Sequence, residues 1–213
     1  MDFTYLFIVL LVVLVSMVLH ELMHGVVAHL LGDDTAKADG RLTLNPLKHL
    51  DPFMSILLPL LLAISGGPIF GGAKPVPINT YNLKYKEWGF ALVALAGPAT
   101  NIFLAFVGFL IGHFTGLFYL ANGFWPMFME AWVFINLGFA IFNIIPIPPL
   151  DGSRLLYAIA PESVQRVMAQ IERYGIILVF ALVMIFGTAL SSFMTGSMQA
   201  IIRAFYWIVG VNV

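Results

Sequence analysis

The sequence predicts an all-α polytopic membrane protein with about four to six transmembrane helices, a re-entrant segment and a short membrane-associated β segment. Of its 213 residues, 61% are hydrophobic and only 10% are charged, whereas about a quarter of the residues in soluble domains are charged. The apolar residues also gather in runs that approach the roughly 20 residues needed to cross a bilayer. These two observations place most of the chain in lipid.

The first apolar run covers residues 3–31. It lacks the basic start and the small-residue cleavage site of a signal peptide and is too long for one, so we expect a retained spanning helix. Further apolar stretches lie at residues 53–64, 88–111, 125–147, 176–190 and 201–211.

Two of these stretches leave alternatives open. The one at 53–64, or 53–66 with its flanking residues, is short and lies between two basic loops. We interpret it as a segment that dips into the membrane and returns, with a tilted helix as the alternative. The last stretch, 201–211 with its lead-in from residue 199, contains Arg203. It is either a short span or an interfacial helix.

The basic residues predict the orientation of the chain. Loops 32–52, 71–87 and 152–174 each contain three Lys or Arg residues, whereas loop 113–124 contains none. Because cytoplasmic loops are enriched in Lys and Arg, we expect a multi-pass protein of the cell membrane with the N-terminus and loop 113–124 outside.

We expect residues 1–213 to form a single membrane-embedded domain, with a core at about 8–160 and C-terminal helices at about 174–211. The net charge of -1 gives no reason to expect a nucleic-acid partner. The chain has no cysteine, which excludes disulfides, thiolate metal sites and cysteine nucleophiles. A metal would therefore need His, Asp or Glu ligands, a donor set that suits zinc.

The stretch "VLHELMHGVV", residues 18–27, places ionisable groups inside the first apolar run. On a helix His20 and His24 share a face, with Glu21 beside them. HExxH on a helix is the arrangement of zinc hydrolases, in which the glutamate is the general base. Because ionisable groups at membrane depth are costly, metal binding is favoured over a pair of hydrogen-bonded interior histidines.

Two histidines do not complete a catalytic zinc site, which usually has three protein ligands and a water molecule. His29 is a poor third ligand because it lies about 180° around the helix from His20. Glu87 and Glu130 lie near the ends of apolar stretches, where we expect exposed carboxylates. His49 and His113 are expected in solvated loops.

Asp151 is a better candidate for the third ligand. It follows the segment "NIIPIPPL", whose three prolines prevent a regular helix. Irregular backbone at membrane depth is tolerated where it is buried in protein or lines a cavity. The alternative is that Asp151 caps the helix that follows.

Together these features resemble the site-2 protease family of intramembrane zinc metalloproteases, in a minimal form without PDZ-like or nucleotide-sensing CBS domains. The matching stretches are "HELMH" at 20–24, "GGAKPVPIN" at 71–79, "AGPATN" at 96–101 and "NIIPIPPLDG" at 143–152.

The resemblance implies a protease that hydrolyses peptide bonds within or near transmembrane segments of membrane-protein substrates in the lipid bilayer. It implies one Zn2+ per chain, held by His20, His24 and Asp151, with Glu21 as the base. It also implies that Asn143 lines the active site, where it could bond the substrate or an oxyanion. The alternative for Asn143 is a bond to a carbonyl freed by the nearby prolines.

Two further residues are candidates for supporting roles. In "AKPVPIN", Pro75 and Pro77 spoil one strand edge, and Lys74, Val76 and Ile78 keep their N–H groups on the other. We expect that other edge to pair with substrate, or the segment to be a stiff loop over the site. Asn101 is expected to bond a neighbouring helix or a zinc-ligating histidine.

The glycines near Asn101, namely Gly97, Gly108 and Gly112, indicate close helix packing.

Two other classes of function have to be weighed. Intramembrane His, Glu and Asp also mark metal-ion or proton transporters, but the internal repeats that many transporters show are not visible in the sequence. A catalytically inactive binder of membrane helices would have no use for Glu21.

Overall fold

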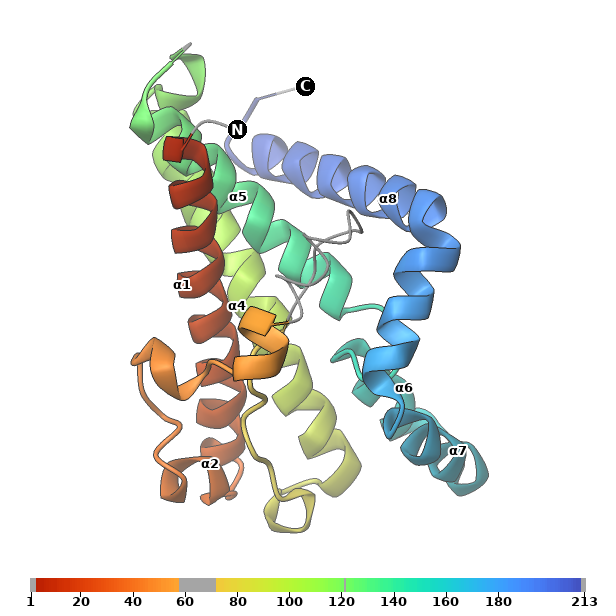
Figure 1. The fold of residues 1–213 in the computed structure, drawn as a ribbon. Helices are drawn as coiled ribbons and strands as arrows, with labels where there is room; N and C mark the ends of the chain where they lie inside the picture. The colour runs from red at the N-terminus through yellow and green to blue at the C-terminus, as the bar shows by residue number, and fades with distance from the viewer. Residues whose placement is uncertain (1–2, 58–71, 121, 212–213) are drawn as a thin grey trace.

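The computed structural model describes residues 3–57, 72–120 and 122–211 (Figure 1). Four long helices dominate it: α1 (Phe3–Leu30), α4 (Lys86–Phe114), α5 (Phe124–Asn143) and α8 (Gly175–Ile208). Three short α-helices accompany them: α2 (Thr35–Ala38), α6 (Gly152–Ile159) and α7 (Glu162–Glu172). Single turns are the 3-10 helices η1 (Pro46–Lys48), η3 (Thr80–Asn82) and η4 (Leu117–Tyr119) and the π-helical η2 (Pro52–Leu57).

The predicted all-α class is confirmed for the described residues, which contain no strand. α1, α4, α5 and residues 177–208 of α8 are each long and apolar enough to cross a membrane. Residues 72–79 have no regular secondary structure, so the expected β segment is not confirmed. Of the expected re-entrant segment, only residues 53–57 are described, as part of η2, and the rest lies outside the described residues.

The core of the fold is a bundle of α1, α4 and α5, in which α4 packs against both of the others (Figure 1). Small residues allow this packing. A side chain at Gly108 of α4 would meet the indole of Trp132 on α5, and that indole donates a hydrogen bond to the Leu104 carbonyl at 2.8 Å. A side chain at Gly112 would likewise meet Phe118. The close helix packing predicted for Gly108 is confirmed, whereas Gly112 packs against the single turn η4.

α8 is one helix with a kink, and it joins the two apolar stretches expected at 176–190 and 201–211. Its 34 residues would reach about 51 Å if straight, well beyond a hydrocarbon core of about 30 Å. The backbone leaves helical geometry at Phe186, with φ -109° and ψ 15°, and divides the helix into two arms (Figure 1). The C-terminal arm packs on α4 and α5 through Phe205, which is buried with Phe109 and Leu137.

The two ends of the bundle differ in charge. The start of α1 and the connection between α4 and α5 share one end (Figure 1). Helices α2, α6 and α7 lie toward the opposite end, with the described basic loops. This is the relative arrangement that the loop charges predicted.

Asp33 fastens the loops at this basic end. Its carboxylate is fully buried and accepts hydrogen bonds from the Thr35 amide (3.1 Å) and hydroxyl (2.5 Å). It also accepts from the Asn79 amide at 2.6 Å and the Asn82 side chain at 3.2 Å. Burial alone would raise the pKa of Asp33, but these hydrogen bonds hold that pKa below its ordinary value.

Arg41 and His49 hold the other end of the segment that starts at residue 72. The buried Arg41 guanidinium donates to the Lys74 carbonyl at 2.6 Å, and the Lys74 amide donates to the His49 carbonyl at 2.8 Å. The expectation that His49 is solvated is wrong. Its ring is fully buried and lies 2.9 Å from the Thr43 carbonyl, because the loop folds back on itself.

Candidate metal centre

α1 brings three potential ligands to one place. His20, Glu21 and His24 each offer a ligand atom within 4.8 Å of the others. The two imidazoles stand nearly perpendicular with centroids 4.7 Å apart, and both residues are buried, at 7% and 6% exposure. The helical period explains this pairing, since residues four apart lie one above the other.

Asp151 completes the cluster from a distant part of the sequence. Its Oδ2 lies 3.1 Å from Nε2 of His20 and 3.4 Å from Nε2 of His24. The proline-rich segment ends α5 and returns the chain to the bundle, and α6 then begins at Gly152. A side chain at Gly152 would collide with the Ile144 carbonyl, so this turn needs glycine. The Asp151 side chain makes no capping hydrogen bond to α6, which removes the support for its alternative role.

The hydrogen bonds of the Nδ1 atoms determine whether the Nε2 atoms, which face Asp151, can bind a cation. Nδ1 of His24 lies 2.7 Å from the Val93 carbonyl, and Nδ1 of His20 lies 2.5 Å from Oδ1 of Asn101. Both partners only accept, so each Nδ1 carries a proton, and in the neutral imidazole each Nε2 then presents a lone pair.

The inner face of the cluster therefore consists of acceptors. Two lone-pair nitrogens face Oδ2 of Asp151, a buried oxygen with no hydrogen-bond donor among the described residues. Buried acceptors without a donor are costly, and a cation between them removes that cost. Two imidazoles and a carboxylate are also a familiar donor set for zinc. The residues present fit the metal that the sequence predicts.

Gly97 lets α4 approach both rings. A Cβ atom there would lie 2.5 Å from Cε1 of His20 and 2.5 Å from Nε2 of His24. The sequence indicated helix packing at this position, and the structure adds that the surface packed against is the pair of imidazoles. Nothing local in the sequence distinguishes Gly97 from Gly108 in this respect.

Glu21 is held by the segment that the sequence assigned to substrate pairing. Its Oε2 accepts a hydrogen bond from the Val76 amide at 3.1 Å. The Lys74 amide is also engaged, by the His49 carbonyl. The expected free edge of donors is therefore wrong at both positions, because the chain uses these amides itself. The alternative, a proline-stiffened loop beside the site, agrees with the geometry.

Asn101 makes both of the contacts that the sequence left open. Besides His20, it bonds a neighbouring helix, since its Nδ2 donates to Oδ1 of Asn136 on α5 at 2.8 Å. Asn136 is fully buried and was not identified from the sequence. The signal that could have found it is an asparagine in the middle of the apolar stretch 125–147, well before Asn143 near its end.

The remaining candidates lie outside the cluster. Asn143 is the last residue of α5 and donates to the Phe139 carbonyl of its own helix at 3.0 Å. Glu87 and Glu130 are exposed, as expected. His29 lies 2.5 Å from Asp34. The expectation that His113 lies in a solvated loop is wrong, because α4 extends to Phe114: His113 is half-buried in its last turn and stacks on Phe109.

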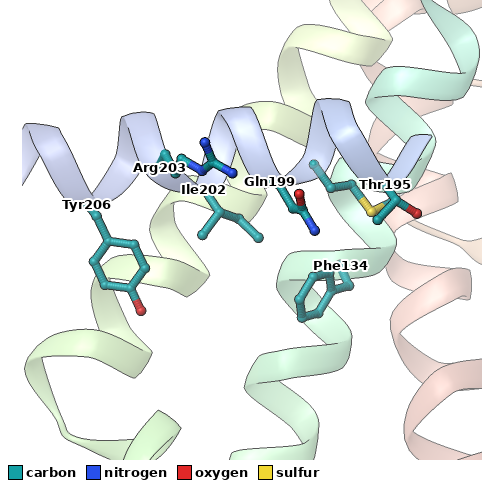
Figure 2. A pocket seen from close by; sticks show the side chains of 7 residues that line it. Phe134, Thr195, Gln199, Ile202, Arg203 and Tyr206 are labelled. Atoms are coloured by element: carbon teal, nitrogen blue, oxygen red, sulfur yellow. The ribbon is translucent and has the colours of Figure 1, made fainter. Parts of the chain in front are cut away.

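A cavity of about 350 Å³ lies elsewhere, between α5 and the C-terminal arm of α8 (Figure 2). Phe134, Ile202 and Tyr206 line it, with Gln199 and Arg203 as polar members. Its described lining contains no His, Asp or Glu. It therefore lacks the groups for metal-assisted hydrolysis, and the chemistry is centred on the cluster between α1, α4 and Asp151.

Comparisons with known proteins agree with this site. The family model for peptidase family M50 matches residues 117–186, a range that includes Asp151 but not the histidines of α1. The chain is 42% identical over 186 residues to "Putative zinc metalloprotease YwhC" of Bacillus subtilis, covering 84% of this chain and 80% of that protein.

Two further relatives are more distant. "Putative zinc metalloprotease Rip2" of Mycolicibacterium smegmatis is 34% identical over 177 residues, which cover 79% of this chain and 63% of that protein. "Putative zinc metalloprotease MJ0611" of Methanocaldococcus jannaschii is 33% identical over 144 residues, which cover 65% and 63%. No solved structure matches the chain.

Proposed function

The chain belongs to peptidase family M50, and from this premise we propose that it is an intramembrane zinc metalloprotease that cleaves membrane-protein substrates within or near their transmembrane segments. The observation that carries the proposal is the convergence of His20, His24 and Asp151 as three buried acceptors, with Glu21 beside them. Cleavage of this kind would make the protein a component of regulated intramembrane proteolysis.

His20, His24 and Asp151 are the proposed zinc ligands. Bound zinc supplies a Lewis acid that polarises a carbonyl group and lowers the pKa of water. The two histidines come from one rigid helix, and their Nδ1 bonds to α4 fix the planes of both rings. Bonds of this kind orient the ligands of a metal site and raise their basicity.

Glu21 is the proposed general base. In the proposed reaction its carboxylate takes a proton from water and later gives it to the leaving amine. The Val76 amide binds Oε2, which orients the carboxylate and leaves Oε1 for the proton. Val76 is thus proposed to position the base rather than to pair with substrate.

The loop charges give the proposed orientation in the membrane. We place the N-terminus outside the cell membrane, and the loops fastened by Asp33 and Arg41 in the cytoplasm. The substrate is proposed to be a protein with a transmembrane helix, which must be unwound before its amides are accessible.

The experiment uses purified protein in liposomes with a single-span reporter, and it measures both zinc content and cleavage. Wild-type protein should hold one zinc ion per chain and cut the reporter. Glu21→Gln keeps the size and polarity of the side chain but cannot accept a proton. It should retain zinc while cleavage falls by about 10² to 10⁴-fold, the usual contribution of general acid–base catalysis.

Other outcomes would favour the rival functions. Zinc binding without cleavage by the wild type would support an inactive binder of membrane helices. Zinc flux across the liposome, undiminished in Glu21→Gln, would support a transporter.

A further inference from the structure

We propose that Asn136, which contacts neither histidine in the described hydrogen bonds, determines which ring nitrogen of His20 carries the proton, by fixing the orientation of the Asn101 amide. Asn136 is therefore a positioning residue for the metal site. The inference rests on the zinc site of the proposed function, and it concerns atoms that the metal itself does not touch.

A backbone carbonyl of α5 fixes the orientation of the Asn136 amide. Nδ2 of Asn136 donates to the Trp132 carbonyl, four residues earlier on α5, at 2.9 Å. Because a carbonyl can only accept, the nitrogen of the Asn136 amide must lie on that side. Its oxygen therefore faces α4. Trp132 is itself fixed, since its indole donates to Leu104 of α4.

The Asn136 amide in turn fixes the orientation of the Asn101 amide across the interface between α5 and α4. Oδ1 of Asn136 accepts from Nδ2 of Asn101 at 2.8 Å, so the oxygen of Asn101 faces α1. That oxygen lies 2.5 Å from Nδ1 of His20, 81 residues away in the sequence. Both asparagines are fully buried, so no water competes for their bonds.

The consequence is a single tautomer of His20. With the Asn101 oxygen in place, Nδ1 of the neutral ring is protonated, and Nε2 is a lone pair that faces Asp151 and would be available to a cation. If the Asn101 amide turned over, its NH2 group would face Nδ1 and move the proton to Nε2. Nε2–H would then donate to Asp151, 3.1 Å away, and could not bind a cation.

Asn136 disfavours the turned-over amide, because its oxygen would then face the oxygen of Asn101. His24 needs no such arrangement, since the Val93 carbonyl contacts its Nδ1 directly. The two ligands thus have the same tautomer for different reasons. His24 depends on a backbone atom, and His20 depends on two side chains.

The test uses the full-length protein in detergent micelles with 15N-labelled histidine. NMR of the metal-free protein gives the tautomer of His20, and competition with a chelator gives the dissociation constant for zinc ions. Asn136→Leu should populate the Nε2–H tautomer of His20 and raise that dissociation constant about tenfold, the lower end of the range for outer partners of metal ligands. Asn136→Ala gives the same comparison if the leucine is not accommodated.

A second variant, Asn101→Asp, tests whether Asn136 acts by orienting the Asn101 amide or only by packing between the helices. In Asn101→Asp, either carboxylate oxygen can accept from Nδ1 of His20, so no amide needs orienting. Adding Asn136→Leu to Asn101→Asp should leave the tautomer and the zinc affinity unchanged. Thr100→Val is the matched control, because among the described residues the Thr100 hydroxyl donates to the Ala96 carbonyl of its own helix, at 2.8 Å. It should change neither quantity.

The outcomes distinguish this inference from the proposed function. Equal losses of zinc affinity on adding Asn136→Leu to wild type and to Asn101→Asp would overturn the positioning role, as would an unchanged tautomer in Asn136→Leu. Wild-type protein that binds zinc but does not cut the reporter would overturn the protease alone. Wild-type protein that binds no zinc would overturn both.

Discussion

Asp33 and Asp151 are two carboxylates that the fold withdraws from water, and they differ in what surrounds them. Asp33 accepts four hydrogen bonds, from Thr35, Asn79 and Asn82. The buried oxygen of Asp151 faces two imidazole nitrogens that are acceptors themselves. Both carboxylates lie close to α1, one just beyond its end and the other against its histidines.

The difference shows how to distinguish a carboxylate that stabilises the fold from one that binds a ligand. A buried carboxylate with several donors is satisfied by the protein, and its contribution is to stability. A buried carboxylate among acceptors is satisfied only by something that the protein binds. Asp33 is fully buried and the Asp151 side chain is 20% exposed, so burial alone would not single out Asp151, and the hydrogen-bond partners carry the distinction. Substitutions at Asp151, Gly97 and Asp33 test this distinction.

Asp151→Asn should have the largest effect on metal binding. The neutral amide keeps the shape of the side chain but is a much poorer zinc ligand, so zinc affinity should fall by more than the roughly 10 to 100-fold typical of an outer partner. The stability of the metal-free protein should not fall, because Asp151 makes no capping bond to α6 and the new amide can donate to the Nε2 lone pair of His20. Chelator competition and thermal unfolding measure the two quantities. Normal zinc affinity in this variant would mean that the third ligand lies elsewhere.

Gly97→Ala should have the next largest effect. The added methyl group would lie 2.5 Å from both imidazoles, and the rings cannot move without breaking their Nδ1 bonds. We expect a loss of zinc affinity of about 10 to 100-fold, comparable to the loss of such an outer partner. Gly196→Ala on α8 is the matched control, since a Cβ atom there meets nothing within 4 Å. An equal change in zinc affinity in both variants would contradict the role of Gly97.

Asp33→Asn should have the smallest effect on the metal and a clear effect on stability. The amide loses hydrogen bonds made to a charged group, which are worth about 1.5–3 kcal/mol, so the free energy of unfolding should fall by that order. Zinc affinity should stay within a few-fold of the wild type. Denaturant unfolding and chelator competition, run beside Asp151→Asn, should give opposite patterns for the two aspartates. Strong zinc loss in Asp33→Asn would contradict the comparison.

The lowered pKa of Asp33 predicts how the stability of the protein depends on pH. The folded-state pKa of Asp33 lies below its ordinary value of 3.8, so its stabilisation is fully present above the unfolded pKa. It is lost as the pH falls through about 4 toward the folded pKa. Asp33→Asn should therefore lose less stability than the wild type over that interval.

The sequence predicted those parts of the fold that depend on local pattern. Hydropathy identified α1, α4 and α5 because a spanning helix must be apolar over its own length. It divided α8 into two stretches, because the kink at Phe186 and the packing of the C-terminal arm on Phe109 depend on contacts with other helices. His49 was misjudged for a similar reason, since a loop residue becomes buried only when its loop folds back.

The amino-acid sequence was enough to predict that the chain lies in a membrane and that His20 and His24 share a helix face. Both conclusions follow from composition and from the fixed period of the α-helix. The sequence did not predict that Asp151 faces both imidazoles without capping α6, that Val76 binds Glu21, or that Asn136 reaches His20 through Asn101. Such contacts depend on how helices are rotated and how closely they approach. That is decided by the packing of side chains distant in sequence, and no local period encodes it.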